Sequence, residues 1–209
     1  IKEVGCPDGG EADLGYVKVA VADWNRDGHD DLVMWSNNGM DGWQRGSLGP
    51  DSWCLKFFPG TADPMNFDSP SPIMADGKHI MAGYRSKPDV VDLDGDGLLD
   101  LIVSCGNGRV NGPGTLMFFR NLSAGESPAG GRASRSPRLA AGVPLKGDDG
   151  KDIGVPVRTA VRFVDWDGDG DLDLFTGSHS PKGLHYWENT GSRTRAVFAA
   201  SKPVALVND

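Results

Sequence analysis

Short apolar runs alternate with turn-forming residues along the chain, and they fall into three groups of three. The first runs are residues 17–22, 89–91 and 161–164, the second are 32–35, 101–103 and 172–175, and the third are 55–57, 116–118 and 184–186. Runs of this length, bounded by Gly, Asp and Asn, are typical of β-strands. The pattern therefore predicts three units with at least three strands each.

An acidic segment separates the first and second run of every unit. The segments start at Asp23, Asp92 and Asp165 and read DWNRDGHDDL, DLDGDGLLDL and DWDGDGDLDL. They recur with a period of about 70 residues, so three repeats account for the whole chain. We expect one region, 1–209, with approximate repeats at 13–83, 84–156 and 157–209.

Each unit reads as a strand, an acidic hairpin, a strand, a longer loop, a strand and a ragged outer strand. Four short strands per repeat is the unit of a β-propeller blade. Proline-rich stretches at 63–72 and 127–144 lie late in their units. They predict outer-edge segments or loops, because proline cannot occupy a central strand. The predicted fold class is all-β, with three four-stranded propeller blades.

Composition supports this fold class and narrows the function. The chain has 30 Gly and 14 Pro among its 209 residues, which favours turns and strands over a helical bundle. A formal net charge of −8 argues against a nucleic-acid partner. No apolar run is long enough to span a membrane.

The three cysteines are Cys6, Cys54 and Cys105, and no CxxC motif occurs. Zinc and haem motifs are therefore not indicated. Three cysteines allow one disulfide, which fits an exported protein. We prefer the pair Cys6–Cys54, because these residues precede the first and third strands of one unit. Cys105 is expected to be a small buried apolar residue.

The acidic segments share the spacing D-x-[DN]-x-D-G-x-x-D, which places oxygen donors at alternate positions of a tight turn. A hard cation that takes six to eight oxygen ligands, Ca²⁺, suits this spacing best. The predicted side-chain ligands of the three sites are Asp23, Asn25, Asp27 and Asp31; Asp92, Asp94, Asp96 and Asp100; and Asp165, Asp167, Asp169 and Asp173. The seventh loop position, occupied by His29, Leu98 and Asp171, would contribute its backbone carbonyl.

Acidic segments of this kind also occur in EF-hands and in turns without a metal. An EF-hand needs Glu at position twelve, where this chain has Met34, Val103 and Thr176. The flanking runs are also of the β type. Plain Asp/Gly turns without a metal are the remaining alternative.

The acidic hairpins, their apolar flanks and the runs Phe118-Phe-Arg-Asn121 and Tyr186-Trp-Glu-Asn189 resemble FG-GAP/VCBS repeats. This resemblance covers nearly the whole chain. It implies blades of an integrin-α-like propeller, bound calcium, and a secreted or cell-surface location. Because closed propellers have four to eight blades, we expect three blades to be completed by oligomerisation or by a longer chain, giving six to eight blades.

The face opposite the calcium loops carries the variable loops, where function normally lies. The candidate ligand-binding residues are Trp43, Arg85, Arg158 and His179. Such side chains suit a sugar or a carboxylate ligand. For each of them an ordinary exposed loop residue is the alternative, and for Arg85 and Arg158 a structural ion pair is a further one.

No catalytic motif stands out, so a calcium-binding module that recognises carbohydrate or protein is the leading hypothesis. An enzyme is the second hypothesis. The resemblance extends to propellers of some polysaccharide lyases, for which His79, Tyr84 and Arg85 would be the candidate residues. The third hypothesis is a purely structural interaction domain of a larger surface protein.

Overall fold

The computed structural model describes residues 18–35, 55–80, 86–106, 114–123, 136–156, 159–179 and 182–205. Every regular element in these ranges is a β-strand, and all strand pairs of the sheets are antiparallel. The predicted all-β class is therefore confirmed. No helix that could cross a lipid bilayer is found among the described residues.

The first and third units each form a four-stranded sheet whose spatial order follows the chain. The first sheet consists of β1 (Lys18–Ala22), β2 (Asp31–Trp35), β3 (Lys56–Phe58) and β4 (Ser71–Pro72). The third consists of β12 (Ala160–Val164), β13 (Asp173–His179), β14 (Lys182–Trp187) and β15 (Lys202–Pro203). These two sheets have the predicted number of strands.

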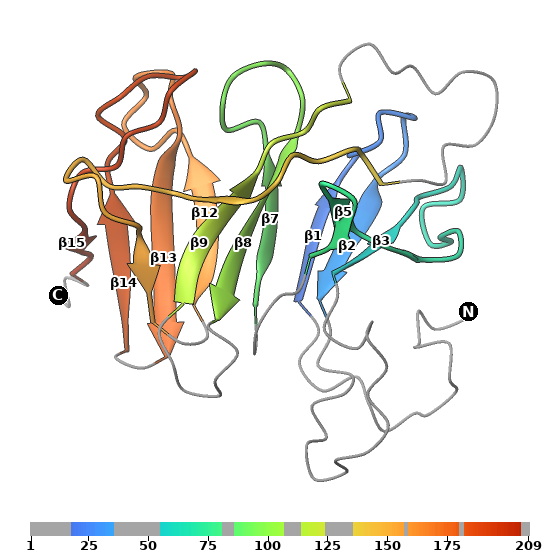
Figure 1. Ribbon diagram of the computed structural model, residues 1–209, viewed down its shortest axis with the longest axis horizontal. Helices are drawn as coiled ribbons and strands as arrows, with labels where there is room; N and C mark the ends of the chain where they lie inside the picture. Colours follow the sequence, from blue (N-terminus) through green and yellow to red (C-terminus); the bar gives the residue numbers. More distant parts are fainter. Residues whose placement is uncertain are drawn as a thin grey trace, which may run out of the picture.

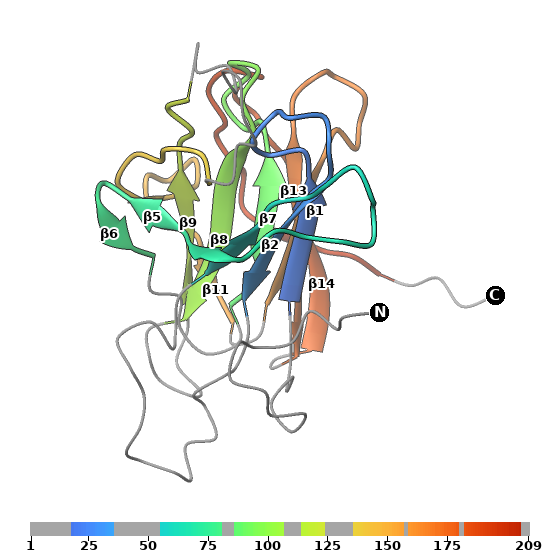
Figure 2. The same cartoon turned by 90° about the vertical axis from the view of Figure 1, so that its right-hand side faces the viewer.

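The middle sheet has the same four-strand order and one additional strand. It consists of β7 (Pro88–Val91), β8 (Asp100–Gly106), β9 (Gly114–Phe119) and β10 (Val143–Pro144), with β11 (Gly154–Val155) also paired to β9. A separate hairpin of β5 (Met74–Ala75) and β6 (Lys78–His79) follows the first sheet. In Figure 2 this hairpin lies on the side of the molecule that also carries β9.

The outer strands β4, β10 and β15 are each two residues long and end in proline. Proline has no N–H to donate, so it is tolerated at a sheet edge and not in the middle. The expectation that the proline-rich stretches lie at outer edges is confirmed for Pro72 and Pro144.

The three sheets lie side by side, and the acidic loops are at the same end of all three (Figure 1). The first strands of the sheets are neighbours, because β7 contacts both β1 and β12. One apolar cluster, with Trp35, Phe57 and Leu101, fills the space between the first and middle sheets. A second, with Leu116 and Leu174, lies between the middle and third sheets. The core is thus formed between sheets.

A turn after one sheet also contacts the outer loop of the next. Asp76 N, in the β5–β6 turn, donates to Leu139 O at 3.1 Å. One unit later, Asp148 N donates to Phe198 O at 2.8 Å. Both acceptor residues are buried, at 2% and 0% exposed. The same contact therefore joins the first sheet to the middle one and the middle one to the third.

Candidate metal centre

The last aspartate of each acidic loop is buried and holds the loop against its sheet. In the second loop, Asp100 Oδ2 accepts Leu93 N at 3.0 Å and Asp100 Oδ1 accepts Asn121 N at 2.8 Å. Asp31 and Asp173 make the equivalent pairs of contacts: Trp24 N and Gly60 N bond to Asp31, and Trp166 N and Asn189 N bond to Asp173. The carboxylate at this position therefore connects, by hydrogen bonds, the start of the loop to a residue that follows the third strand.

Burial raises the pKa of two of these carboxylates, Asp31 and Asp100, because the charged form loses its hydration. The pKa of Asp100 is raised to about 7 and that of Asp31 to about 6, in each case mainly by burial. The neighbouring Asp94 and Asp96 raise the pKa of Asp100 further. Such a site carries negative charge that a bound cation would compensate.

Glycine at the sixth loop position has a left-handed backbone, as the sharp reversal requires. Its φ is 90° at Gly28, 86° at Gly97 and 95° at Gly170. Its N–H donates to the first aspartate of the loop in all three units, for example from Gly97 to Asp92 Oδ2 at 3.1 Å. The predicted tight turn is therefore present in each unit.

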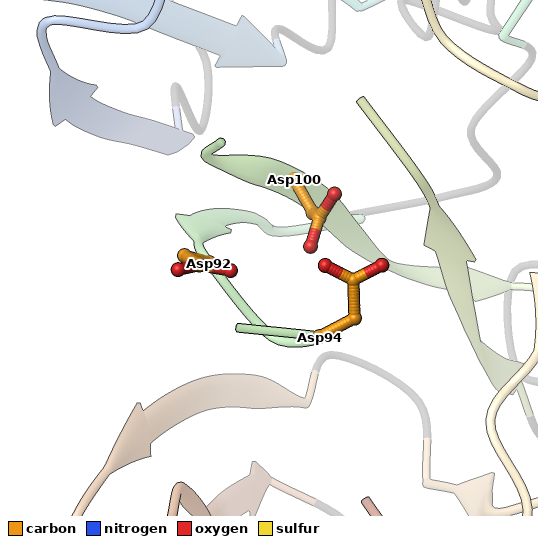
Figure 3. Close-up of side chains that lie close together, drawn as sticks. All are labelled: Asp92, Asp94 and Asp100. Carbon is orange, nitrogen blue, oxygen red and sulfur yellow. The ribbon is translucent and has the colours of Figure 1, made fainter. Parts of the chain in front are cut away.

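The second loop brings three carboxylates together. One oxygen each of Asp92, Asp94 and Asp100 lies within 4.8 Å of the others, and Figure 3 shows the three side chains around one space. Oδ1 of Asp92 and Oδ1 of Asp94 are buried and have no hydrogen-bond partner among the described residues. A buried carboxylate oxygen without a partner is costly, so these donors fit an oxygen-seeking cation.

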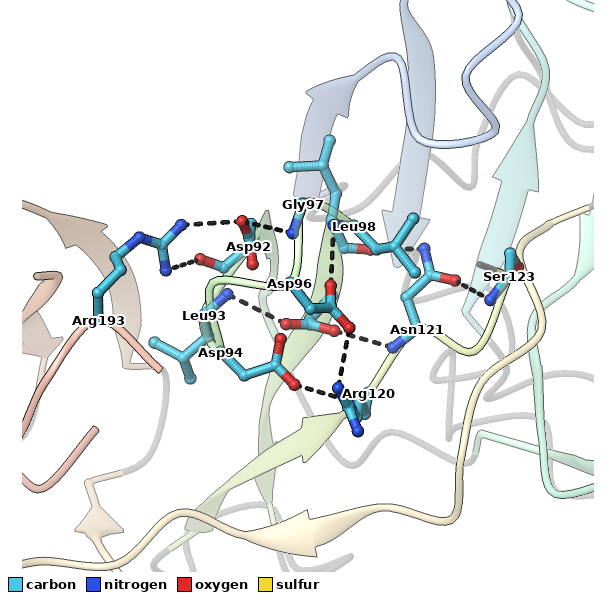
Figure 4. A network of polar contacts seen from close by, with 12 residues as sticks. Asp92, Leu93, Asp94, Asp96, Gly97, Leu98, Arg120, Asn121, Ser123 and Arg193 are labelled. Carbon is cyan, nitrogen blue, oxygen red and sulfur yellow. Dashed lines mark hydrogen bonds and ion pairs between the residues drawn. The ribbon is translucent and has the colours of Figure 1, made fainter. Parts of the chain in front are cut away.

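Two arginines reach the same loop from outside it (Figure 4). Arg120 Nε lies 2.6 Å from Asp94 Oδ2, and Arg120 Nη2 lies 3.0 Å from Asp96 Oδ2. Arg193, from the third unit, contacts Asp92 Oδ2 at 2.9 Å and donates to Asp92 O at 2.6 Å. Both guanidinium groups engage Oδ2 atoms, so the buried Oδ1 atoms of Asp92 and Asp94 remain.

The sequence interpretation did not assign roles to these arginines. Arg120 belongs to the Phe118–Asn121 run, and its place beside Asn121 is the only signal for it in the sequence. No arginine occupies the position of the first unit, after Gly60, that is equivalent to Arg193. Only the packing of the third unit against the second brings it to Asp92.

The third loop is the most exposed of the three. One oxygen each of Asp165, Asp167 and Asp169 lies within 4.8 Å of the others. No ion pair to these carboxylates occurs within the described ranges. The loop therefore concentrates negative charge without the arginines of the second loop.

Asp171 adds a side-chain oxygen to the third loop. It is only 6% exposed, and its Oδ1 is buried without a hydrogen-bond partner in the described part of the chain. Burial and the nearby carboxylates of Asp169 and Asp173 raise its pKa. The sequence interpretation gave this position a backbone role, and the structure adds an unsatisfied carboxylate.

The first loop, described in full, does not bring three carboxylates within 4.8 Å of one another. Asn25 Nδ2 donates to Asp27 Oδ2, and Asp27 N donates to Asp23 Oδ1, both at 3.0 Å. His29 is half-buried, and its backbone N–H donates to Asp27 Oδ1 at 3.0 Å. Arg26 has a φ of 61° where the other two loops have glycine. This loop keeps the turn, and its third position offers the amide oxygen of Asn25 where the other two loops offer a carboxylate.

Most of the candidate ligand-binding residues lie outside the described residues. This applies to Trp43, Tyr84, Arg85 and Arg158, and also to the expected disulfide pair Cys6–Cys54. His179 ends β13, at the end of the sheet away from the acidic loop, and His79 ends β6 at the outer hairpin. The structure thus describes no grouping of these residues.

Cys105 is a free, half-buried cysteine that packs against the cluster between the first and middle sheets. Burial raises the pKa of its thiol to about 12. This agrees with the expected role as a small apolar residue.

Comparison of the chain with protein-family models, with curated proteins and with solved structures gives no match.

Proposed function

We propose that this chain is a calcium-binding module of the β-propeller type, whose acidic loops use Ca²⁺ to stabilise one end of the sheets. The observation that carries the proposal is the convergence of carboxylates in the second and third loops, with the buried, unpartnered oxygens of Asp92, Asp94 and Asp171. The first loop has the same spacing and is proposed as a third site.

The donor set favours calcium over other metals. The converging groups are carboxylate oxygens, which are ligands of hard cations. When bound, Ca²⁺ would supply positive charge to carboxylates that burial and mutual repulsion now destabilise. Asp92 and Asp94 would hold it in the second loop, and Asp165, Asp167 and Asp169 in the third.

The arrangement of the sheets supports the propeller part of the proposal. Three antiparallel sheets with the same strand order pack face against face, and their first strands are neighbours. A propeller repeats such sheets around a central axis. The three sheets of the described residues do not close into a ring, so a propeller would require further sheets.

Calcium titration of metal-free protein tests the site. We expect bound ions by calorimetry and a lower melting temperature after chelation, because an ion at a hundredfold excess over Kd stabilises the folded state by about 2.7 kcal/mol per site. Asp167→Asn should remove one ion. Asp149→Asn, an exposed carboxylate outside the acidic loops, is the matched control and should remove none. Chelation that leaves melting unchanged, with no bound calcium, would refute the proposal.

We further propose that the module acts outside the cell, as a secreted or surface protein that recognises a carbohydrate or protein ligand. The support is the sequence resemblance and the composition of the variable loops. A glycan array probed with calcium-loaded protein tests carbohydrate recognition, and no bound glycan would contradict it. Incubation with uronic-acid polysaccharides, followed by absorbance of the unsaturated product, tests the lyase alternative.

A further inference from the structure

On the side away from the middle sheet, the third sheet carries large apolar side chains at positions that are buried in the other two units. The residue after the first loop aspartate is Trp24, Leu93 or Trp166. Their exposed fractions are 1%, 4% and 67%. The same chemistry at the same place in the repeat is thus covered twice and exposed once.

The third strand repeats this difference. Register with the second strand makes Leu55, Leu116 and Leu184 equivalent, and they are 0%, 0% and 43% exposed. In the same sheet, the ring centroids of Phe175 and Tyr186 are 5.2 Å apart, and those of Phe175 and Trp166 are 5.1 Å apart. Three exposed residues, Val164, Trp166 and Leu184, and two half-buried ones, Phe175 and Tyr186, make up an aromatic and aliphatic surface that we call the far face.

The buried equivalents show what covers such a face. Trp24 packs edge-on against Phe57 with ring centroids 5.7 Å apart, and its Nε1 donates to Leu99 O of the middle sheet at 2.8 Å. Leu101 and Val103 of the middle sheet complete this cluster. The next sheet of the repeat therefore covers this face, and the eighth position of its acidic loop supplies the backbone carbonyl that accepts the indole N–H.

The first sheet of this chain presents the complementary surface. Val21 is equivalent to Val90 and Phe163, which pack in the clusters toward the preceding sheet, but Val21 is 58% exposed and Val19 is 51% exposed. The loop between β3 and β4 of this sheet contains Phe67, and within the described ranges no backbone N–H donates to its carbonyl.

Phe67 occupies the place of Leu139 and Phe198 in the repeat, since it bridges Gly60 as they bridge Asn121 and Asn189. Leu139 O and Phe198 O each accept an N–H from the turn of the preceding unit. The Phe67 carbonyl is therefore placed for such a turn.

We propose that the far face binds the first sheet of a second copy of this chain. Two copies related by a two-fold axis then form two identical junctions and a ring of six sheets, within the range of four to eight found in propellers. At each junction Trp166 Nε1 donates to Asp30 O, the equivalent of Leu99 O. The proposal rests on the propeller-type packing of the proposed function and does not depend on calcium binding.

Light scattering at fixed calcium concentration tests this proposal. The wild-type chain should have twice the single-chain mass of 22.2 kDa. Leu184→Asp on the far face and Val21→Asp on the first sheet should each give monomers, because both put a charge into the junctions. Val143→Asp, at a 52% exposed position on the outer edge of the middle sheet, is the matched control and should remain a dimer.

Mixing the two monomeric variants provides the decisive measurement. One of the two junctions in a mixed pair joins two unmodified surfaces, so a mixture of Leu184→Asp and Val21→Asp should regain dimers that neither variant forms alone. Circular dichroism of each variant confirms that it is folded, and Trp166→Ala serves as a second far-face variant. A monomeric wild-type chain would overturn the proposal. So would dimerisation of Val21→Asp alone, which would indicate that far faces bind each other.

Discussion

Replacing Trp24 with alanine tests whether the sheets are held together by the residue after the first loop aspartate. Trp24 is 1% exposed, packs against Phe57, and donates its indole N–H to Leu99 O. Removing a large buried aromatic side chain costs about 3–5 kcal/mol. Leu99 O keeps the amide of Asn121 as a donor, so no buried carbonyl loses all its partners, and the loss should stay within that range.

The measurement is urea unfolding followed by tryptophan fluorescence, with dilute protein so that copies do not associate. Because domain stabilities are roughly 5–15 kcal/mol, the midpoint of Trp24→Ala should fall by about a fifth or more of its wild-type value. Trp166→Ala is the control at the equivalent position of the third loop. Its side chain is 67% exposed, and the expected loss is below about 1 kcal/mol. Equal losses for the two variants would refute the burial argument.

Two further predictions concern charged groups. Burial raises the pKa of Asp89 above its ordinary value of 3.8, more than pairing with Arg162 lowers it. The folded-state pKa of Asp89 therefore lies above its unfolded-state pKa. As the pH rises from the unfolded-state pKa to the folded-state pKa, this carboxyl group destabilises the folded protein. The unfolding free energy of Asp89→Asn relative to wild type should therefore rise as the pH increases above about 4, and a constant difference would contradict this. Arg120→Gln should raise the calcium affinity of the second loop several-fold, because it removes a positive charge from Asp94 and Asp96. Titration in an Asp167→Asn background, with Arg138→Gln as the control, measures this, and an unchanged affinity would show that Arg120 does not compete with the ion.

The sequence alone determined the elements that depend on local chemistry. Three apolar runs per unit predicted the three main strands of each sheet, since alternation of side chains is a property of a single strand. Glycine at the sixth loop position predicted the left-handed turn found at Gly28, Gly97 and Gly170. The proline-rich stretches that end at Pro72 and Pro144 predicted outer-edge segments or loops, because a missing N–H has the same consequence in any fold. The acidic spacing likewise identified the residues that approach one another in the second and third loops.

Tertiary structure decided which equivalent residues are buried and which charges meet. Trp24 and Trp166 stand at the same position of the repeat, yet only packing against a following sheet buries one and leaves the other exposed. Arg193 reaches Asp92 across about a hundred residues of chain because the third unit packs on the second, and no local pattern encodes that approach. The second loop therefore gains Arg193 as a partner through packing, whereas the equivalent of Arg120 at the third loop is Glu188, a difference already present in the sequence. Local sequence sets strand, turn and donor type, whereas burial and charge pairing depend on neighbours distant in the chain.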